Sequence, residues 1–414
     1  MGLHDGAVKY YWRLLVLIES LILFSIMHGL METENPTFRG HSRLHSSETV
    51  QVETYGGDPI QIHANPKIQA HLKTLNISID PRLQIAARSI LPHVPNADAM
   101  LPLESLNYYL NASGAVYWDT EQVFLETEDT DDLAVYKKLL SSQKRHVSGF
   151  GTRIGFAQQW SLFPRLKRKI IALVAHPKFI LDPLARHVSP RTDFKVAGRV
   201  SPGISDVSVM TLDENGHQLT VPAHIENDQL SAPLNLSPGQ WTIEVVGDTK
   251  FGPLPLGQFK LCAGCLSDRV FRAPNPQPDL TDTPPERQLM SLINESRRRF
   301  GLAPIAHHPI LGSVARAHTK DMLNHDFIGH RSVTTGEIEE RLKRVNLTPS
   351  MFGENIAKNT SIEDVHRSLM HSVSHRLNIL EPSFTNVGLG IEYADGHWTV
   401  TEVFARLDQR VSQL

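Results

Sequence analysis

Cysteine is scarce in this chain of 414 residues, which contains only Cys262 and Cys265. A structural zinc site of the common kind needs four Cys or His ligands, and no second Cys pair is available to complete one. The spacing Cys-Ala-Gly-Cys leaves four interpretations open: a redox pair, half of a zinc site, a small local disulfide, or two thiols at a strand end. The last two are favoured, and a fold held by many disulfides is excluded.

An excess of charge of either sign is also missing, since the formal net charge is -3 and charged residues make up 21% of the chain. The one short basic run, residues 297–299, lies on a predicted helix beside Glu295 and is typical of a solvated helix face. Phosphate binding normally requires a basic surface. Nucleic acid is therefore not expected as a partner.

Long hydrophobic runs are absent except near the amino terminus, where Lys9 and Arg13 precede an apolar stretch, residues 14–27, that Glu19 interrupts. This pattern is typical of an export signal and is short for a membrane span. No clean cleavage site follows it. Residues 1–31 are therefore predicted to be a signal peptide or a membrane anchor, the anchor lying within residues 12–31, and the chain is expected in the cell envelope or outside the cell.

Several catalytic motifs are missing as well. The chain has no Gly-x-Ser-x-Gly nucleophile motif, no phosphate-binding glycine loop and no His-Glu-x-x-His. These absences remove the most readily recognised classes of hydrolase and nucleotide-binding enzyme.

What the chain does have is ordinary globular composition, with 41% hydrophobic residues, and a length sufficient for two or three domains. Residues 32–79 show little periodicity and are predicted to be a flexible lead-in. Residues 273–285 contain repeated prolines, which fix φ and disfavour helix in the preceding residue, and are predicted to be an extended linker.

Short alternating runs between residues 186 and 272 predict a small β-sandwich. Two of them, residues 207–212 and 240–246, are separated by turn sequences that include Asn215-Gly216. Asn-Gly supplies the positive φ angles of a tight hairpin, and alternation buries one face of each strand. We expect this domain to act in spacing or adhesion.

The last third of the chain carries an ordered set of short phrases that resemble the SCP/CAP superfamily, the domain of cysteine-rich secretory proteins, wasp antigen 5 and plant pathogenesis-related proteins. The resemblance is to the bacterial extracellular type, and it implies an α-β-α sandwich over residues 286–408. The phrases are Asp326-Phe-Ile-Gly-His330, Phe352-Gly-Glu354-Asn, Ser374-His375-Arg-Leu-Asn378, Asn386-Val-Gly-Leu-Gly390 and Thr401-Glu402-Val-Phe404.

The same resemblance implies a cleft lined by two His and two acids. His330 and His375 match the two imidazoles, and Glu354 matches the first acid. In eukaryotic members the second acid lies on the helix before the second His, three residues after a Trp, and the resemblance places Leu369 at the Trp position and Ser372 at the acid position of this chain. The second acid is therefore missing, and the neighbouring Glu402 is the candidate replacement.

Asn378, three residues after His375, is interpreted as a side-chain cap or backbone staple for the following turn, and it completes the candidate ligand cleft. His318 falls among the core positions of a predicted amphipathic helix. A hydrogen-bonded buried imidazole is the favoured interpretation there.

The chemistry that these residues permit is limited. Two neutral imidazoles, His330 and His375, can bind Zn²⁺ or a similar divalent ion, with Glu354 and Glu402 orienting the rings or taking a proton from a bound water. Two His are one short of the usual three-ligand catalytic zinc site. The set is also explained as a hydrogen-bonded network, because leaving such groups buried and unpaired would cost on the order of 1–3 kcal/mol each.

Residues 80–185 contain short segments that are similar in sequence to the carboxy-terminal domain. Asp80-Pro-Arg-Leu resembles His308-Pro-Ile-Leu at an offset of 228, and Val123-Phe-Leu-Glu126 resembles Met351-Phe-Gly-Glu354 at the same offset. In this alignment Glu402 corresponds to Ala172, and nothing corresponds to His330. The sequence predicts an internal duplication in which the first unit is a degenerate CAP-like α/β domain. Chance similarity of two α/β segments is the alternative.

Three functions follow. The first is an exported, non-catalytic CAP-domain protein that binds a small apolar or carbohydrate ligand or a cell-envelope component, with a divalent metal as a candidate addition; the resemblance implies lipid or sterol binding in several members. The second is a metal-dependent extracellular hydrolase. The third is a purely structural surface protein. A membrane is expected to be contacted only through the amino-terminal segment.

Overall fold

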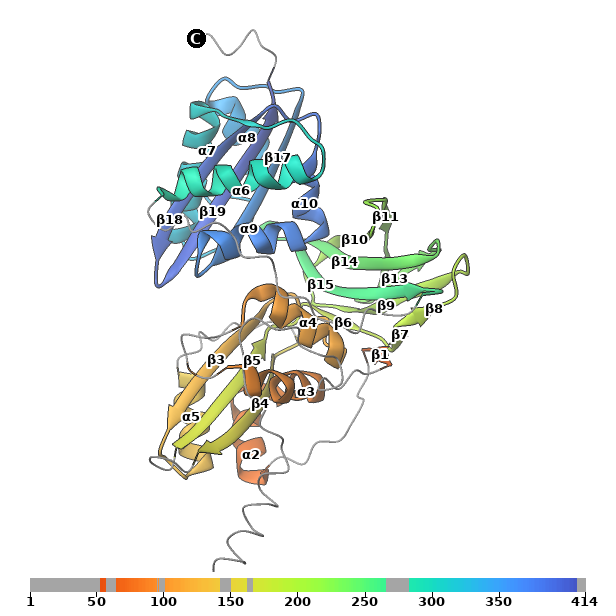
Figure 1. Ribbon diagram of the computed structural model, residues 1–414, viewed down its shortest axis with the longest axis vertical. Helices are drawn as coiled ribbons and strands as arrows, with labels where there is room; N and C mark the ends of the chain where they lie inside the picture. Colours follow the sequence, from red (N-terminus) through yellow and green to blue (C-terminus); the bar gives the residue numbers. More distant parts are fainter. Residues whose placement is uncertain are drawn as a thin grey trace, which may run out of the picture. The chain divides into compact units, whose positions relative to one another are not determined.

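A computed structural model describes residues 53–56, 65–94, 96, 101–141, 150–161, 167–265 and 283–407. All of them lie in one compact unit, residues 44–414. The described part is a mixed α/β structure with several separate sheets (Figure 1). The predicted signal or anchor, residues 1–31, and nearly all of the predicted linker, residues 273–285, lie outside the described residues. No helix in the described part is long and apolar enough to span a membrane.

The carboxy-terminal domain is built on a four-stranded sheet of order β16-β18-β19-β17. β16 pairs with β18 in parallel and the other neighbours are antiparallel. Asp395 and Gly396 both have positive φ and form the turn between β18 and β19, as an Asp-Gly hairpin predicts. The strands are β16 (Ala306–His307), β17 (Met351–Asn359), β18 (Asn386–Ala394) and β19 (His397–Arg406).

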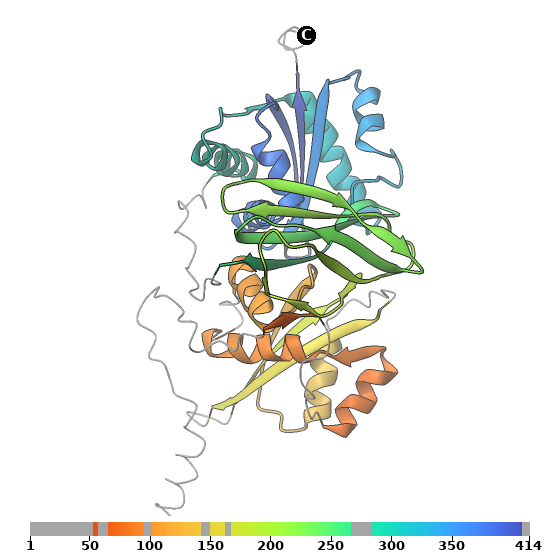
Figure 2. The same cartoon turned by 90° about the vertical axis from the view of Figure 1, so that its right-hand side faces the viewer.

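Helices cover both faces of this sheet because β19 is apolar on both sides. Val400 and Phe404 pack with α6, α9 and α10, whereas Val403 and Ala405 pack with α7 and α8. Figure 2 shows the strands between these two helical layers. The helices are α6 (Pro285–Arg299), α7 (Pro309–Asn324), α8 (Ile338–Arg344), α9 (Ile362–His371) and α10 (Val373–Leu380).

The segment that carries His375 differs from the sequence prediction. The sequence, with Asp364 three residues after Ser361, predicts one helix that starts at Ser361, runs towards Ser374 and presents His375 at its carboxy-terminal end. Instead α9 ends at His371, Ser372 adopts an extended conformation (φ -72°, ψ 134°), and α10 begins at Val373. The Ser372 side chain caps the new helix by accepting from the His375 amide, so His375 lies in the first turn of α10.

Residues 179–263 form two sheets that share one apolar core. The five-stranded sheet has the order β11-β10-β14-β15-β8, and the four-stranded sheet has the order β12-β13-β9-β6. The alternation of Trp241, Ile243 and Val245 places these side chains in the shared core. The strands are β6 (Phe179–Leu181), β8 (His187–Val188), β9 (Phe194–Val200), β10 (Ser205–Asp213), β11 (Gln218–Pro222), β12 (His224–Glu226), β13 (Gln229–Leu234), β14 (Gly239–Thr249) and β15 (Gly252–Ala263).

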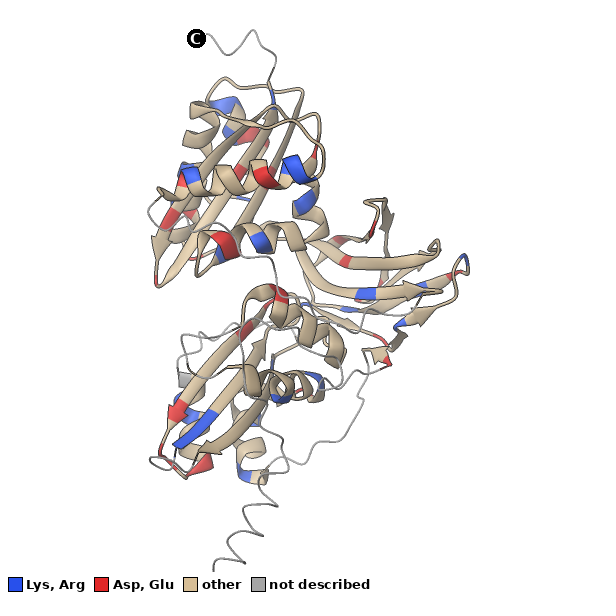
Figure 3. Cartoon of the chain, in the orientation of Figure 1, with Lys and Arg blue, Asp and Glu red and all other residues tan. Residues whose placement is uncertain are grey.

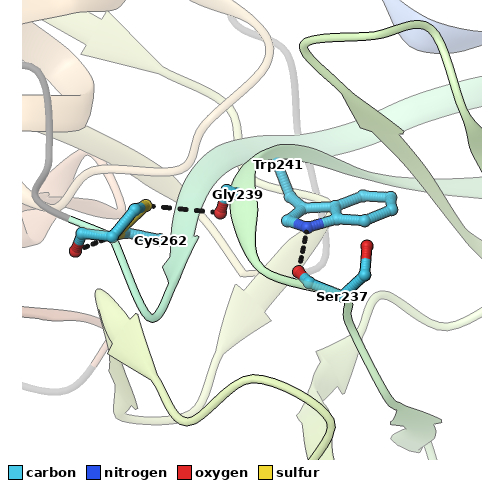
Figure 4. The surroundings of a disulfide bond; sticks show 5 residues. Ser237, Gly239, Trp241 and Cys262 are labelled. Atoms are coloured by element: carbon cyan, nitrogen blue, oxygen red, sulfur yellow. Dashed lines mark hydrogen bonds between the residues drawn. A yellow bond between two sulfur atoms is a disulfide. The ribbon is translucent and has the colours of Figure 1, made fainter.

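Cys262 and Cys265 form a disulfide where β15 ends (Figure 4). The Cys265 sulfur lies 3.3 Å from the Gly239 carbonyl oxygen at the start of β14, and nearby the Trp241 indole Nε1 donates to the Ser237 carbonyl at 2.9 Å. The disulfide spans a sequence separation of 3. Because the closed loop is so short, it restrains the chain only locally.

The amino-terminal α/β part has the same architecture as the carboxy-terminal domain. Its sheet order β2-β4-β5-β3 again has one parallel pair, β2 with β4, and two antiparallel pairs. Helices α3 and α4 cover one face and α2 and α5 the other. The elements are α2 (Pro66–Thr74), β2 (Ile77–Ile79), α3 (Pro81–Ile90), α4 (Leu103–Ser113), β3 (Thr120–Thr127), α5 (Asp132–Ser141), β4 (Thr152–Ser161) and β5 (Lys167–Ala175).

Residues 65–79 are not a flexible lead-in, so that prediction is corrected. Asn65 caps α2 by accepting from the Lys67 amide, and the helix buries Ile68 and Leu72. β2 then pairs with β4. Two buried positions in nine residues produce a weak periodic signal, which explains why the sequence did not reveal the helix. Of the rest of the predicted lead-in, the structure describes β1 (Thr54–Tyr55), which pairs with β7 (Leu184–Ala185).

Matching glycines set the same helix-to-sheet distance in both α/β parts. A Cβ on Gly155 would lie 2.1 Å from the Leu83 carbonyl carbon in α3, and a Cβ on Gly388 would lie 2.0 Å from the Leu311 carbonyl carbon in α7. Leu83 and Leu311 differ by the offset of 228 found in the sequence. Each glycine therefore allows its helix backbone to lie directly on the sheet.

We expect Gly388→Ala to destabilise the protein by at least about 3 kcal/mol, because the new methyl group must push α7 away from β18. Urea denaturation of the full chain measures this. Gly396→Asn is the matched control, since Gly396 has positive φ, which Asn tolerates, and no atom near an added Cβ. Equal stability of the two variants would contradict this account of the packing.

Candidate functional site

His330 is held by a buried ion pair. Its Nδ1 lies 2.9 Å from Glu354 Oε1 in β17. Arg341 in α8 donates to both carboxylate oxygens of Glu354, at 2.8 and 3.1 Å, and also to the His330 carbonyl oxygen at 2.8 Å. The bidentate geometry fixes the carboxylate, and the carboxylate fixes the imidazole.

The charges around Glu354 control its ionisation. Burial raises the pKa of this carboxyl group, but the hydrogen bond from His330 and the nearby Arg341 guanidinium outweigh burial and lower the pKa to about 2. Glu354 therefore stays ionised at neutral pH. Each of its oxygens already accepts at least one hydrogen bond.

His375 is held by a different partner. Its Nδ1 lies 2.8 Å from the Ser372 hydroxyl oxygen, which belongs to the residue that caps α10. Burial lowers the pKa of His375 to about 3, and His330 lowers it further by charge repulsion. The imidazole is therefore neutral near pH 7, with one ring nitrogen a donor and the other an acceptor.

The two imidazoles lie next to each other with a matching arrangement. Their ring centroids are 6.4 Å apart and the ring planes differ by 26°. In both rings Nδ1 is engaged, while Nε2 has no hydrogen-bond partner in the described part of the chain. Neither Nε2 belongs to the described unpaired atoms that are fully buried, so each keeps some accessible surface.

Two asparagines tie the imidazole segments to the sheet. Asn378 in α10 donates to the Glu354 carbonyl at 3.1 Å and to Asn355 Oδ1 at 2.9 Å. Asn355 in turn donates to the His375 carbonyl at 3.0 Å. The Asn378 side chain thus connects α10 to β17.

Glu402 does not supply the second acid, and that prediction is corrected. Its Oε2 accepts from Asn355 Nδ2 at 3.0 Å, so these two side chains share one face of the sheet. Successive side chains of a strand point to opposite faces, which puts Glu354, the neighbour of Asn355, on the other face. Glu402 makes no contact with either imidazole, and burial raises its pKa to about 7 despite the hydrogen bond from Asn355.

A different carboxylate contacts the Ser372 hydroxyl, which is the partner of the second imidazole. Glu244 in β14 accepts from the Ser372 hydroxyl at 3.2 Å and from the amides of Val373 and Ser374 at 2.9 and 3.0 Å. Sequence analysis missed it because Glu244 occupies an outward position of a strand whose alternate residues form the core of another domain. Nothing in the sequence indicated that this outward face is buried.

His318 lies in the core, as the helical pattern predicted. Its Nε2 lies 2.9 Å from the Gly329 carbonyl oxygen, and burial lowers its pKa. The imidazole supports the loop that leads to His330.

Comparison with known proteins identifies the domain. Residues 290–404 match the Cysteine-rich secretory protein family (CAP). The chain therefore carries a domain of the CAP superfamily, as its sequence phrases predicted. Over 115 residues it is 35% identical to the uncharacterized protein YkwD of Bacillus subtilis, covering 28% of this chain and 45% of that protein.

A second relative is the uncharacterized membrane protein YlbC of Bacillus subtilis, 29% identical over 115 residues, or 27% of this chain and 32% of YlbC. The chain thus matches less than half the length of both curated relatives. Among solved structures, an extracellular protein containing a SCP domain from Bacillus anthracis aligns over 68% of this chain and 97% of its own, with 19% identity and a TM-score of 0.28. The family assignment rests on the sequence match.

The site as placed does not fit a tetrahedral zinc ion. Zinc–nitrogen bonds of about 2.0–2.1 Å at a tetrahedral angle bring two nitrogens to roughly 3.4 Å from each other. Imidazole rings whose centroids are 6.4 Å apart cannot bring their nitrogens that close without moving. Within the described residues, no group of three or more His, Cys, Asp or Glu side chains is arranged to hold a metal ion.

We expect the raised pKa of Glu402 to make stability fall with rising pH. The folded state keeps a proton that the unfolded chain releases above a pKa of 4.5, so the free energy of unfolding declines between pH 4.5 and about pH 7. The loss is on the order of 3 kcal/mol. Glu402→Gln removes this decline, which urea denaturation between about pH 5 and pH 8 measures.

The control for this prediction is Glu392→Gln, which replaces a partly exposed acid of β18. Its pH profile should follow that of the unmodified protein. The same pH slope in the Glu402→Gln variant would show that Glu402 is ionised in the folded state.

Proposed function

We propose that the CAP domain is a non-catalytic binding unit whose cleft takes a small ligand with hydroxyl donors between His330 and His375. One observation carries the proposal: both rings have Nδ1 engaged by the protein and Nε2 unpaired and open. A neutral imidazole with a proton on Nδ1 offers a lone pair at Nε2. Two such acceptors side by side suit two hydroxyl groups, each of which donates to one ring.

Apolar surface near the cleft favours a lipid-like ligand over a carbohydrate. Phe352 is 37% exposed and lies two positions before Glu354 in β17, which puts it on the same face of the sheet. Ile328, two residues before His330, is 42% exposed. An amphipathic molecule, such as a sterol or a long-chain alcohol, combines an apolar body with the donor that Nε2 needs.

Hydrolysis has weaker support. A general base works best with a pKa near the operating pH, and the pKa of Glu354 is lowered to about 2 by His330 and Arg341 against the effect of burial. The other proposed acid, Glu402, faces the opposite side of the sheet. The metal-dependent hydrolase is therefore the secondary candidate, and it requires the two rings to move together.

We also infer that the amino-terminal α/β part is a duplicate of the CAP domain without a site. The identical strand order and the matching glycines support this. In the amino-terminal sheet Gln122 opposes Leu173 and Val123 opposes Ala172. In the carboxy-terminal sheet Glu354 opposes Val403 and Asn355 opposes Glu402. Alignment of Ala172 with Glu402 therefore aligns Gln122 with Glu354. The sequence had aligned Glu126 with Glu354, a register four residues away.

The protein is proposed to act outside the cytoplasm. The apolar segment of residues 14–27 supports export, by a cleaved signal or by an anchor. Lys, Arg, Asp and Glu are interspersed along helices such as α6 and α9 (Figure 3), which suits a solvated surface. Nucleic acid is not a proposed partner, and a cell-envelope lipid is the proposed ligand source.

A first test measures binding of a fluorescent sterol, a long-chain alcohol and a soluble oligosaccharide to the full chain. We expect the sterol or the alcohol to bind, and His330→Ala/His375→Ala to weaken that binding about tenfold or more, because each lost acceptor costs about 1 kcal/mol. His397→Ala, at the start of β19, is the control. Binding that the double variant leaves unchanged would reject the proposed cleft.

A second test concerns the metal. Titration calorimetry with ZnCl₂ should show no binding that depends on His330 and His375, since the rings are too far apart for one ion. Zinc binding that the double variant abolishes would instead favour the hydrolase. A crystal soaked with Zn²⁺ would then show how the rings converge.

A further inference from the structure

We propose that Glu244 of the β-sandwich is the second acid of the cleft, a positioning residue that orients His375 through Ser372. This inference rests on the proposed function in one respect, the role of His375 as a ligand acceptor. The acid is supplied from β14, at a sequence separation of 128 from Ser372.

Glu244 is bound as an anion is bound at a helix start. Its Oε1 accepts from the Ser372 hydroxyl and from the Ser374 amide, and its Oε2 accepts from the Val373 amide. Gln258 adds a further donor to Oε2 at 3.2 Å. The carboxylate thus satisfies free amides of the first turn of α10 and meets the positive end of the helix dipole.

These donors offset part of the cost of complete burial. The Glu244 side chain is inaccessible, and burial raises its pKa, while the hydrogen bonds from Ser374, Val373 and Ser372 act in the opposite direction. All four described neighbours donate to the two oxygens. This arrangement stabilises the ionised carboxylate, because a protonated acid would need an acceptor for its own hydrogen.

The carboxylate determines which way the Ser372 hydroxyl points. When the hydroxyl donates to Glu244 Oε1, its oxygen offers lone pairs to the His375 side. His375 then carries its proton on Nδ1 and donates it to Ser372, which leaves the lone pair on Nε2. A hydroxyl freed from Glu244 could instead donate to Nδ1 and move the proton to Nε2.

Glu354 does the same for His330 directly, since His330 Nδ1 contacts a carboxylate oxygen. The two rings are therefore oriented by two acids, one in direct contact and one through a serine. Ser372 occupies the place where the resemblance to eukaryotic CAP proteins expects the second acid. Glu244 restores that charge from outside the CAP domain.

The same β14–β15 hairpin also contacts the His330 segment. The Phe251 carbonyl accepts from the Arg331 amide at 2.9 Å, and the Thr249 carbonyl accepts from the Arg331 guanidinium at 2.9 Å. A Cβ on Gly329 would lie 2.4 Å from the Phe251 oxygen, so the contact is tight. The hairpin thus touches the segments that carry both imidazoles and helps to set their separation.

The test uses the full chain with Glu244→Gln, Ser372→Ala and the control Glu226→Gln, an exposed acid of the same sandwich. Long-range ¹H–¹⁵N NMR spectra report the tautomer of each imidazole. We expect the Nδ1–H form of His375 to give way to the Nε2–H form in the first two variants, while His330 keeps its tautomer. The control should match the unmodified protein.

Ser372→Ala keeps the Glu244 contacts to the Val373 and Ser374 amides, so it reports on the relay even if Glu244→Gln folds poorly. Binding of the sterol or alcohol probe should weaken about tenfold in both variants, the value of one lost hydrogen bond. An unchanged His375 tautomer in Ser372→Ala would overturn the inference.

The outcomes separate this inference from the proposed function. A tautomer change without any probe binding supports Glu244 as the positioning residue and rejects the ligand role of the cleft. Probe binding that needs His330 and His375 but tolerates Glu244→Gln and Ser372→Ala, with no tautomer change, rejects Glu244 and keeps the ligand role.

Discussion

The buried ion pair of Arg341 and Glu354 is the interaction on which the cleft depends. Glu354 is almost inaccessible, so its charge is tolerated only because Arg341 and His330 complete its hydrogen bonds. The pair joins β17 to α8 and to the loop after α7, three segments that no backbone ladder connects. Removal of either partner would leave an uncompensated charge in the interior, so the site and the local fold are one structure.

The sequence predicted this part of the site well for a physical reason. Three short motifs contain His330, Glu354 and His375, and the order of these motifs along the chain does not depend on the conformation of the loops between them. The structure brings the three side chains together. The Asp395-Gly396 turn and the core position of His318 could also be predicted from the sequence, because turn residues and helical periodicity are local signals. Local patterns therefore gave the domain and one of its two acids.

The rest depended on contacts that no local pattern encodes. Glu402 is the candidate by sequence because it introduces a carboxylate on the neighbouring strand, but strand alternation points its side chain to the face opposite Glu354. In the sequence, Glu244 has the pattern of a solvent-facing strand residue. In the structure, the neighbouring domain buries its side chain. Under the proposed duplication, strand pairing aligns Gln122 with Glu354, four residues away from Glu126 of the similar Phe-x-Glu sequence, because only the sheet reveals the pairing.

If Glu244 positions His375, the functional unit of this protein includes the β-sandwich as well as the CAP domain. Family comparison covers residues 290–404, and the acid beside Ser372 lies outside that range. Natural substitutions in the β-sandwich would thus alter the cleft of the CAP domain even where the sequence of the CAP domain is unchanged. The β-sandwich, which by sequence alone resembled a spacer, would evolve under the same selection as the cleft that it touches.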